Sequence, residues 1–174
     1  RIDRDELIEA IEWIEDEIAE VYAKNLFVRD GTNYFFNMDK LKKRNTPLSG
    51  PASIIKKYLP KVNGIEKVFT KQEILDADTT DKIIRRMKNM IHPERSPDVF
   101  ALISAGYIYR TPYGTGHGSP YDYDTHVPLL FSRKGRVARQ VSKRVETADI
   151  APTLGHILSI PYPESVNGKL LEIE

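Results

Sequence analysis

Apolar side chains recur at spacings of three and four over residues 3–21, and this period predicts an amphipathic helix. Asp3 and Glu6 stand three residues apart at its start, as a capping pair requires. The apolar stripe consists of Leu7, Ile11, Ile14, Ile18 and Val21. Most acidic residues of this segment lie off the stripe, so we predict a solvated acidic face and not a metal or proton-transfer site.

The middle of the chain alternates short strand-like and helix-like segments. Strands are predicted at residues 33–37, 65–69 and 98–103, and helices at residues 51–59 and 80–90. Residues 98–103 are apolar on both faces, which is typical of a parallel sheet covered by helices. We interpret residues 41–48 as a polar linker. The alternation of strands and helices without internal repeats favours an α/β layered fold.

The last third of the chain contains a long glycine-containing loop and a final helix. Residues 114–131 are too long and too specific to be only a connector. The loop begins as irregular backbone and ends at residues 127–131 in an apolar run, for which we predict a buried strand. A helix over about residues 147–158 follows, starting with Thr147 as cap. Its predicted buried side consists of Ile150, Leu154, Ile157 and Leu158.

Composition is ordinary for one soluble domain spanning residues 1–174. Apolar residues make up 40% and charged residues 29% of the 174 positions. The net charge of +1 gives no reason to expect a nucleic acid or an anionic membrane as partner. No apolar run approaches the length of a membrane span. The absence of cysteine excludes disulfides and thiolate metal sites. Because the chain begins with Arg1 and no signal-peptide pattern follows, we expect a piece of a longer protein.

His117 is the first candidate for chemistry in the loop. It lies between Gly116 and Gly118, so little side-chain bulk would hinder the approach of a ligand or metal to its imidazole. Neutral imidazole is a good ligand for zinc. A His-Gly pair alone does not separate a metal ligand from a structural histidine, and both interpretations stand at this point.

Further polar residues surround His117. Asp122 and His126 are four residues apart, a spacing that would place both on one face of a helix. Prolines bracket the pair, so we do not expect a helical turn there. We predict instead that Asp124 and His126 brace the loop or orient a neighbouring ligand by hydrogen bonding, with Thr115 as a third candidate for this role.

Two motifs in this region resemble a known family. Residues 114–121 (Gly-Thr-Gly-His-Gly-Ser-Pro-Tyr) and 123–131 (Tyr-Asp-Thr-His-Val-Pro-Leu-Leu-Phe) resemble the C-terminal signature of the alkaline phosphatase superfamily. The branch is that of the phosphate-irrepressible alkaline phosphatases, close to the type I phosphodiesterase/nucleotide pyrophosphatase enzymes. Residues 145–154, with the closing Asn167-Gly168-Lys169-Leu170-Leu171, are similar to the last helix and closing turn of these enzymes. Gly116 departs from the threonine expected at its position.

The resemblance implies the C-terminal portion of a doubly wound, alkaline-phosphatase-like α/β sheet sandwiched by helices. It also implies a site with two zinc ions, in which His117 matches the position of a metal ligand. The family takes its threonine or serine nucleophile and its other ligands from preceding sequence, so we assign no catalytic residue here and expect the nucleophile upstream of Arg1. This chain contains no adjacent Asp-His pair of the kind the family uses. We therefore expect a fragment that supplies one metal ligand and is inactive alone.

The function implied is hydrolysis of phosphate monoesters through a covalent phospho-enzyme. Phosphodiesterase, sulfatase or phosphotransferase chemistry of the same superfamily are alternatives, because the discriminating residues lie outside this region. A catalytically dead binding or assembly domain is an alternative of another class, and an incomplete sheet with an exposed edge predicts self-association. The resemblance implies a periplasmic or secreted location.

Overall fold

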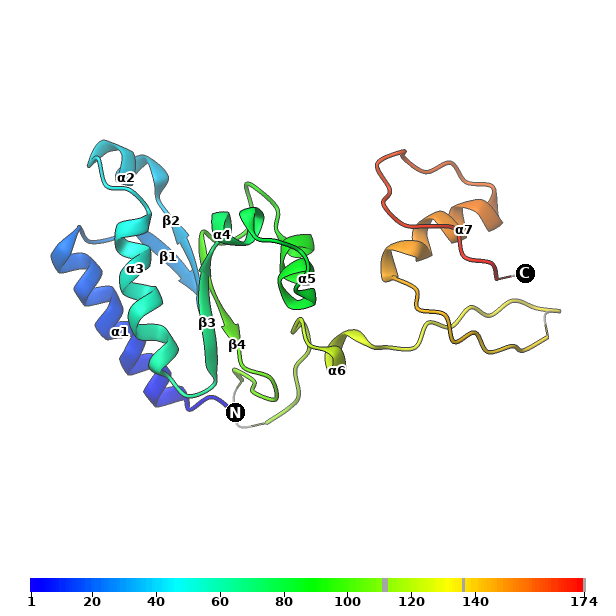
Figure 1. Cartoon of the computed structure of the whole chain (residues 1–174), viewed down its shortest axis with the longest axis horizontal. Helices are drawn as coiled ribbons and strands as arrows, with labels where there is room; N and C mark the ends of the chain where they lie inside the picture. The colour runs from blue at the N-terminus through cyan, green and yellow to red at the C-terminus, as the bar shows by residue number, and fades with distance from the viewer. Residues whose placement is uncertain (111–112, 136, 174) are drawn as a thin grey trace. The chain divides into compact units, whose positions relative to one another are not determined.

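The computed structural model describes residues 1–110, 113–135 and 137–173. Two compact units are present, Arg1–His126 and Val127–Glu174 (Figure 1). Within the described part of the chain, no helix is both long enough and apolar enough to cross a lipid bilayer.

The first unit is built on a four-stranded sheet. Its strands are β1 (Phe27–Asp30), β2 (Asn33–Phe36), β3 (Ile65–Thr70) and β4 (Val99–Ile103), in the order β1-β2-β4-β3. Every neighbouring pair is antiparallel, and Val99 of β4 lies opposite Tyr34 of β2 and Thr70 of β3. The strands predicted at residues 33–37, 65–69 and 98–103 are confirmed, but the parallel arrangement expected for residues 98–103 is wrong. The strand is apolar on both sides because it is central in a sheet covered by helices on both faces.

One face of the sheet is covered by α1 (Arg4–Val21), α3 (Ser49–Tyr58) and the 3-10 helix η1 (Leu59–Lys61). The buried residues of α1 are Leu7, Ile11, Ile14 and Ile18, which confirms the predicted stripe except at Val21, whose side chain is exposed. Asp3 caps α1 by accepting the amides of Asp5 and Glu6. The carboxylate of Glu6 accepts the Asn63 amide instead of returning to the cap.

The opposite face is covered by α4 (Lys71–Asp76) and α5 (Lys82–Met90). A second apolar cluster forms there from Phe69, Ile74, Met87 and Leu102, with Tyr121 packed against it. Helices on both faces confirm the predicted sandwich, as Figure 1 shows for this unit. Successive side chains of β3 and β4 point alternately to the two faces of the sheet, so both strands contribute to both apolar clusters.

The predicted linker at residues 41–48 is wrong in its first part, which belongs to α2 (Met38–Lys43). Asn37 caps this helix by accepting the Lys40 amide, and Leu41 anchors it in the core. Six residues with one buried position carry too little periodicity to be recognised as a helix from the sequence.

The second unit contains the 3-10 helix η2 (Thr147–Asp149) followed by α7 (Ile150–Leu158), where the final helix was predicted. Its buried side is different from the prediction. Asp149 and Thr153 are buried, whereas Leu154 and Leu158 are exposed. The reason is a polar hub: Asp149 accepts the amides of Glu146 and Lys169, and the Thr153 hydroxyl accepts the Leu171 amide.

The buried strand predicted at residues 127–131 is also wrong. These residues have no regular secondary structure, and the side chains of Val127 and Leu130 are 60% and 88% exposed. A strand needs a partner for its backbone groups, and no strand in the described ranges pairs with this segment. Pro128 also lacks the N–H that a ladder would use.

Candidate functional site

The part of the signature loop that belongs to the first unit ends in α6 (Asp122–Thr125). His117 lies on this part of the loop with its side chain exposed. Gly118 has φ +97°, a left-handed conformation that favours glycine. A Cβ at Gly116 would lie 2.6 Å from Cδ1 of Ile108, so a threonine there would require that side chain to move. The imidazole of His117 is thus open to solvent beside a backbone that suits glycine.

Asp124 folds back onto the loop that carries His117. Its Oδ2 accepts the Ser119 amide at 2.6 Å. This hydrogen bond is the main reason that the pKa of Asp124 lies below its usual range, and the nearby His117 acts in the same direction. Asp124 therefore braces the backbone two residues from His117. That it orients His117 itself remains a prediction.

Asp122 begins a short helix, and His126 directly follows its last residue. A short helix does exist here, contrary to the expectation, because the prolines lie outside its bounds. His126 ends it, with its amide donating to the Asp122 carbonyl at 3.1 Å. The Asp122 carboxylate is engaged by Lys82 and Arg86 of α5, and these partners, Lys82 first, lower its pKa. His126 and Thr115 are both exposed, and their predicted orienting roles stay predictions.

Sequence reasoning missed the residues that fix this segment to the sheet and to α5. The Tyr121 hydroxyl lies 2.8 Å from the Ile103 carbonyl and 2.6 Å from Oε2 of Glu66. The Tyr123 hydroxyl accepts the Gly106 amide at 3.1 Å. Burial and then the Glu66 carboxylate raise the pKa of Tyr121, so its hydroxyl stays protonated. The partners lie 17 to 55 positions apart, and no local pattern reveals such pairs.

Among the described residues, His117 does not belong to a cluster of metal-binding side chains. Nowhere in residues 1–110, 113–135 and 137–173 do three or more histidine, cysteine, aspartate or glutamate side chains gather in a group that could bind a metal. A catalytic zinc site needs three protein ligands. His117 has the right chemistry for one of them, so a zinc ion at this position would require ligands from elsewhere.

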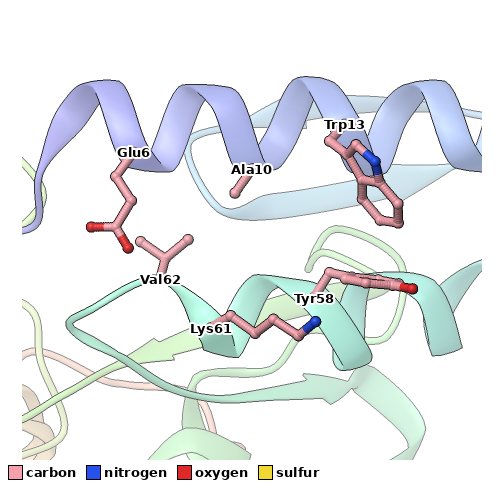
Figure 2. Close-up of a pocket in the computed structure, with 6 residues that line it drawn as sticks. All are labelled: Glu6, Ala10, Trp13, Tyr58, Lys61 and Val62. Atoms are coloured by element: carbon pink, nitrogen blue, oxygen red, sulfur yellow. The ribbon is translucent and has the colours of Figure 1, made fainter.

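Two hollows lie away from the signature loop. The first, of about 210 Å³, lies between α1 and the end of α3 with η1 (Figure 2). Trp13 and Tyr58 line it with ring centroids 4.1 Å apart, and Lys61 lies over the Tyr58 ring. The second, of about 830 Å³, is an open groove between α3 and α4 that contains the Lys56–Glu73 ion pair. Neither is lined by a residue of the signature loop.

Comparison with known proteins finds several alkaline phosphatases among the relatives of this chain. No model of a known protein family matches the chain. The alkaline phosphatase PhoV of Synechococcus elongatus is 27% identical over 136 residues, covering 78% of this chain and 25% of the relative. The alkaline phosphatase PhoK of a Sphingomonas species is 31% identical over 129 residues, covering 67% of this chain and 23% of the relative. The chain thus spans about a quarter of the length of these relatives.

The fold is shared with a solved structure of the same kind. A crystal structure of alkaline phosphatase PafA superposes with a TM-score of 0.79 at 23% identity, covering 94% of this chain and 32% of that chain. PafA of Elizabethkingia meningoseptica is also similar in sequence, at 26% identity over 167 residues. The structural likeness supports the predicted fold class over most of the chain.

Proposed function

Because the chain belongs to the alkaline phosphatase superfamily and corresponds to its C-terminal part, we propose that it is the portion of a metal-dependent phosphate-ester hydrolase that contributes His117 as one zinc ligand. The observation that carries the proposal is the exposed His117 on a loop braced by Asp124, in a chain whose relatives include several alkaline phosphatases. We also propose that the protein is exported to the periplasm or secreted.

The contribution of this chain to the reaction is positional. Imidazole binds zinc through one neutral ring nitrogen, and the flanking glycines leave that ring accessible. Asp124 holds the backbone two residues after His117, and in the proposal this brace helps to direct the imidazole ring. Bound zinc would supply positive charge that stabilises the transferring phosphoryl group and activates the attacking oxygen. The nucleophile and the remaining ligands come from outside this chain in the proposal.

The proposal predicts that residues 1–174 alone do not hydrolyse phosphate esters. The test is turnover of an aryl phosphate by the purified chain with added zinc, compared with an aryl phosphodiester and an aryl sulfate. We expect no rate above that of buffer for any of them, because one histidine cannot hold the metal in a catalytic geometry. Turnover that disappears on chelation of zinc would contradict the proposed incompleteness of the site.

A matched pair of variants tests the ligand assignment in the same chain. We expect zinc to shift the ring resonances of His117, weakly and reversibly. Zinc binding by the chain should weaken in the His117→Ala variant and stay unchanged in the control variant His92→Ala. His92 is the control, since it also lies on an exposed loop of the first unit and its Nδ1 accepts the Glu94 amide. The assignment fails if zinc perturbs the other histidines while the His117 resonances stay unchanged.

A further inference from the structure

The segment that follows His117 is fastened to α5 by two basic side chains. Arg86 donates from Nη1 to the Pro120 carbonyl at 2.7 Å and from Nη2 to Oδ1 of Asp122 at 2.9 Å. Lys82, one helical turn earlier, forms an ion pair with the other carboxylate oxygen of Asp122. Through these two side chains, α5 provides partners for both the Pro120 carbonyl and the Asp122 carboxylate at the start of α6.

We propose that Arg86 is the positioning residue of the His117 loop, a clamp that holds residues 119–126 in the arrangement that presents His117. The use that we assign to this clamp, presenting His117 to a metal, rests on the proposed function. The ordering of the loop by Arg86 does not depend on metal or on turnover.

The two basic side chains are not equivalent. The Arg86 side chain is only 16% exposed, whereas those of Lys82 and Asp122 are 53% and 60% exposed. An exposed ion pair such as Lys82–Asp122 contributes little because water screens it. Arg86 makes two directed hydrogen bonds, and its bond to the Pro120 carbonyl is partly shielded from solvent. Most of the clamping therefore falls to Arg86.

The anchors of the segment form a continuous path from α5 to His117. Arg86 holds residues 120 and 122, and Tyr121 between them is bonded to the Ile103 carbonyl at the end of β4. Asp124 then carries the constraint back to the Ser119 amide, two positions from His117. If the Arg86 contacts are lost, Tyr121 and Tyr123 remain as the ties between this segment and the rest of the first unit.

A bystander role for Arg86 would look different. An arginine that only adds to the stability of the first unit would, when removed, weaken every part of that unit together. Removal of a positioning residue would loosen the loop and leave the sheet unchanged, because β3 and β4 pair directly with each other and Arg86 takes no part in that pairing.

The test is amide hydrogen exchange of the 1–174 chain with Arg86→Ala. The reporting amides are those of Ser119, Asp124, Thr125 and His126, all hydrogen-bonded within the segment. We expect their protection to fall by roughly tenfold or more, as for the loss of charge-assisted hydrogen bonds, with β4 amides unchanged. We also expect the ring resonances of His117 to shift or broaden.

Companion variants make the result specific. Arg86→Lys should restore part of the protection, since one ammonium cannot serve both acceptors in the fork geometry of a guanidinium. Asp122→Asn should loosen the same four amides from the other side of the clamp. Arg85→Ala is the control: this exposed neighbour contacts the Thr79 carbonyl and not the loop, and protection should stay at the level of the unmodified chain.

Two outcomes would overturn the inference. One is protection of the four amides within twofold of the unmodified chain in both Arg86→Ala and Asp122→Asn. The other is an equal fall of protection in β4 and in the loop, which would make Arg86 a general stabiliser. Neither result depends on zinc or turnover, so the hydrolase proposal could fail while this inference stands, and the reverse.

Discussion

At the scale of single residues, the sequence identifies which side chains are candidates for a functional site better than it identifies the residues that they contact. His117 and Asp124 stand out because of their glycine-rich, polar surroundings, and the structure places them on one exposed loop. Asp122 also stands out, but its carboxylate pairs with Lys82 and Arg86, 40 and 36 positions away. The spacing of a residue to its neighbours in the chain says nothing about contacts made across such distances.

The same limit explains why the buried side of α7 in the second unit differs from the predicted one. The periodicity of residues 150–158 correctly predicts a helix but assigns its buried side to the apolar residues. In the structure Asp149 and Thr153 are buried beside Pro152, because each polar side chain satisfies backbone groups of neighbouring segments. The need of these backbone amides for hydrogen-bond acceptors outweighs hydrophobicity here. The pattern of apolar residues in the sequence does not reveal that need.

The hub of the second unit predicts a specific pH dependence. The Lys169 amide and then the Glu146 amide lower the pKa of Asp149, because they stabilise the charged carboxylate. A carboxyl group with a depressed pKa stabilises the fold at pH values above its usual pKa of about 4, and this contribution is lost as the pH falls through the depressed value. Protection of the Lys169 amide should therefore stay constant from neutral pH to about 4 and fall at lower pH.

The variant Asp149→Asn provides the check. An uncharged amide side chain should give lower protection at neutral pH and no further loss attributable to this position in acid. Glu164→Gln, an exposed carboxyl group in the same unit, should leave the profile unchanged. A profile with the same acid midpoint in Asp149→Asn and the unmodified chain would contradict the assignment.

At the scale of elements, periodicity and caps find the long and the central segments. The first helix, the strands at residues 33, 65 and 99 onward, and the helices at residues 49 and 82 onward follow from the pattern. The short α2 and α6 do not, because four to six residues carry too few positions for a period to appear. The antiparallel pairing also escapes prediction, since strand direction depends on contacts between distant segments.

Asp98 is the residue at which three elements meet. Its Oδ2 accepts the Phe36 amide at 2.8 Å at the end of β2, and its Oδ1 lies 3.1 Å from the Lys71 ammonium at the start of α4. Its own carbonyl accepts the Lys71 amide. Both side chains of the ion pair are largely shielded from solvent, at 15% and 20% exposure. The carboxylate thus joins β2, β4 and α4.

We predict that Asp98→Ala lowers the free energy of unfolding of the first unit by about 2–3 kcal/mol, since it leaves the Phe36 amide unpaired and the shielded Lys71 ammonium with only the Ser96 carbonyl as a partner. Denaturant unfolding followed by the fluorescence of Trp13, the single tryptophan, measures this unit. Asp39→Ala, at an exposed position of α2, should change the value by less than about 0.5 kcal/mol. Equal effects of the two substitutions would contradict the joining role of Asp98.

At the scale of the whole molecule, the fold class and the family follow from sequence, and the division into two units does not. The apolar run at residues 127–131 predicts burial, yet Val127 and Leu130 are exposed. Leu154 and Leu158 of α7 are exposed as well, and neither apolar cluster formed by the described residues includes a residue of the second unit, so this unit presents apolar surface. Such surface favours association, and self-association of the chain stays a prediction that sedimentation velocity can test.

The central claim is that His117 completes a zinc site whose other ligands this chain lacks, and metal content measures it most directly. The protein to analyse is a chimera in which residues 1–174 replace the matching third of PafA, purified as folded monodisperse material, with His117→Ala and the control His92→Ala prepared alongside. We predict that the chimera and the His92 variant bind two zinc ions per chain, as the family resemblance implies, and that His117→Ala binds one. Full zinc occupancy in His117→Ala would contradict the claim.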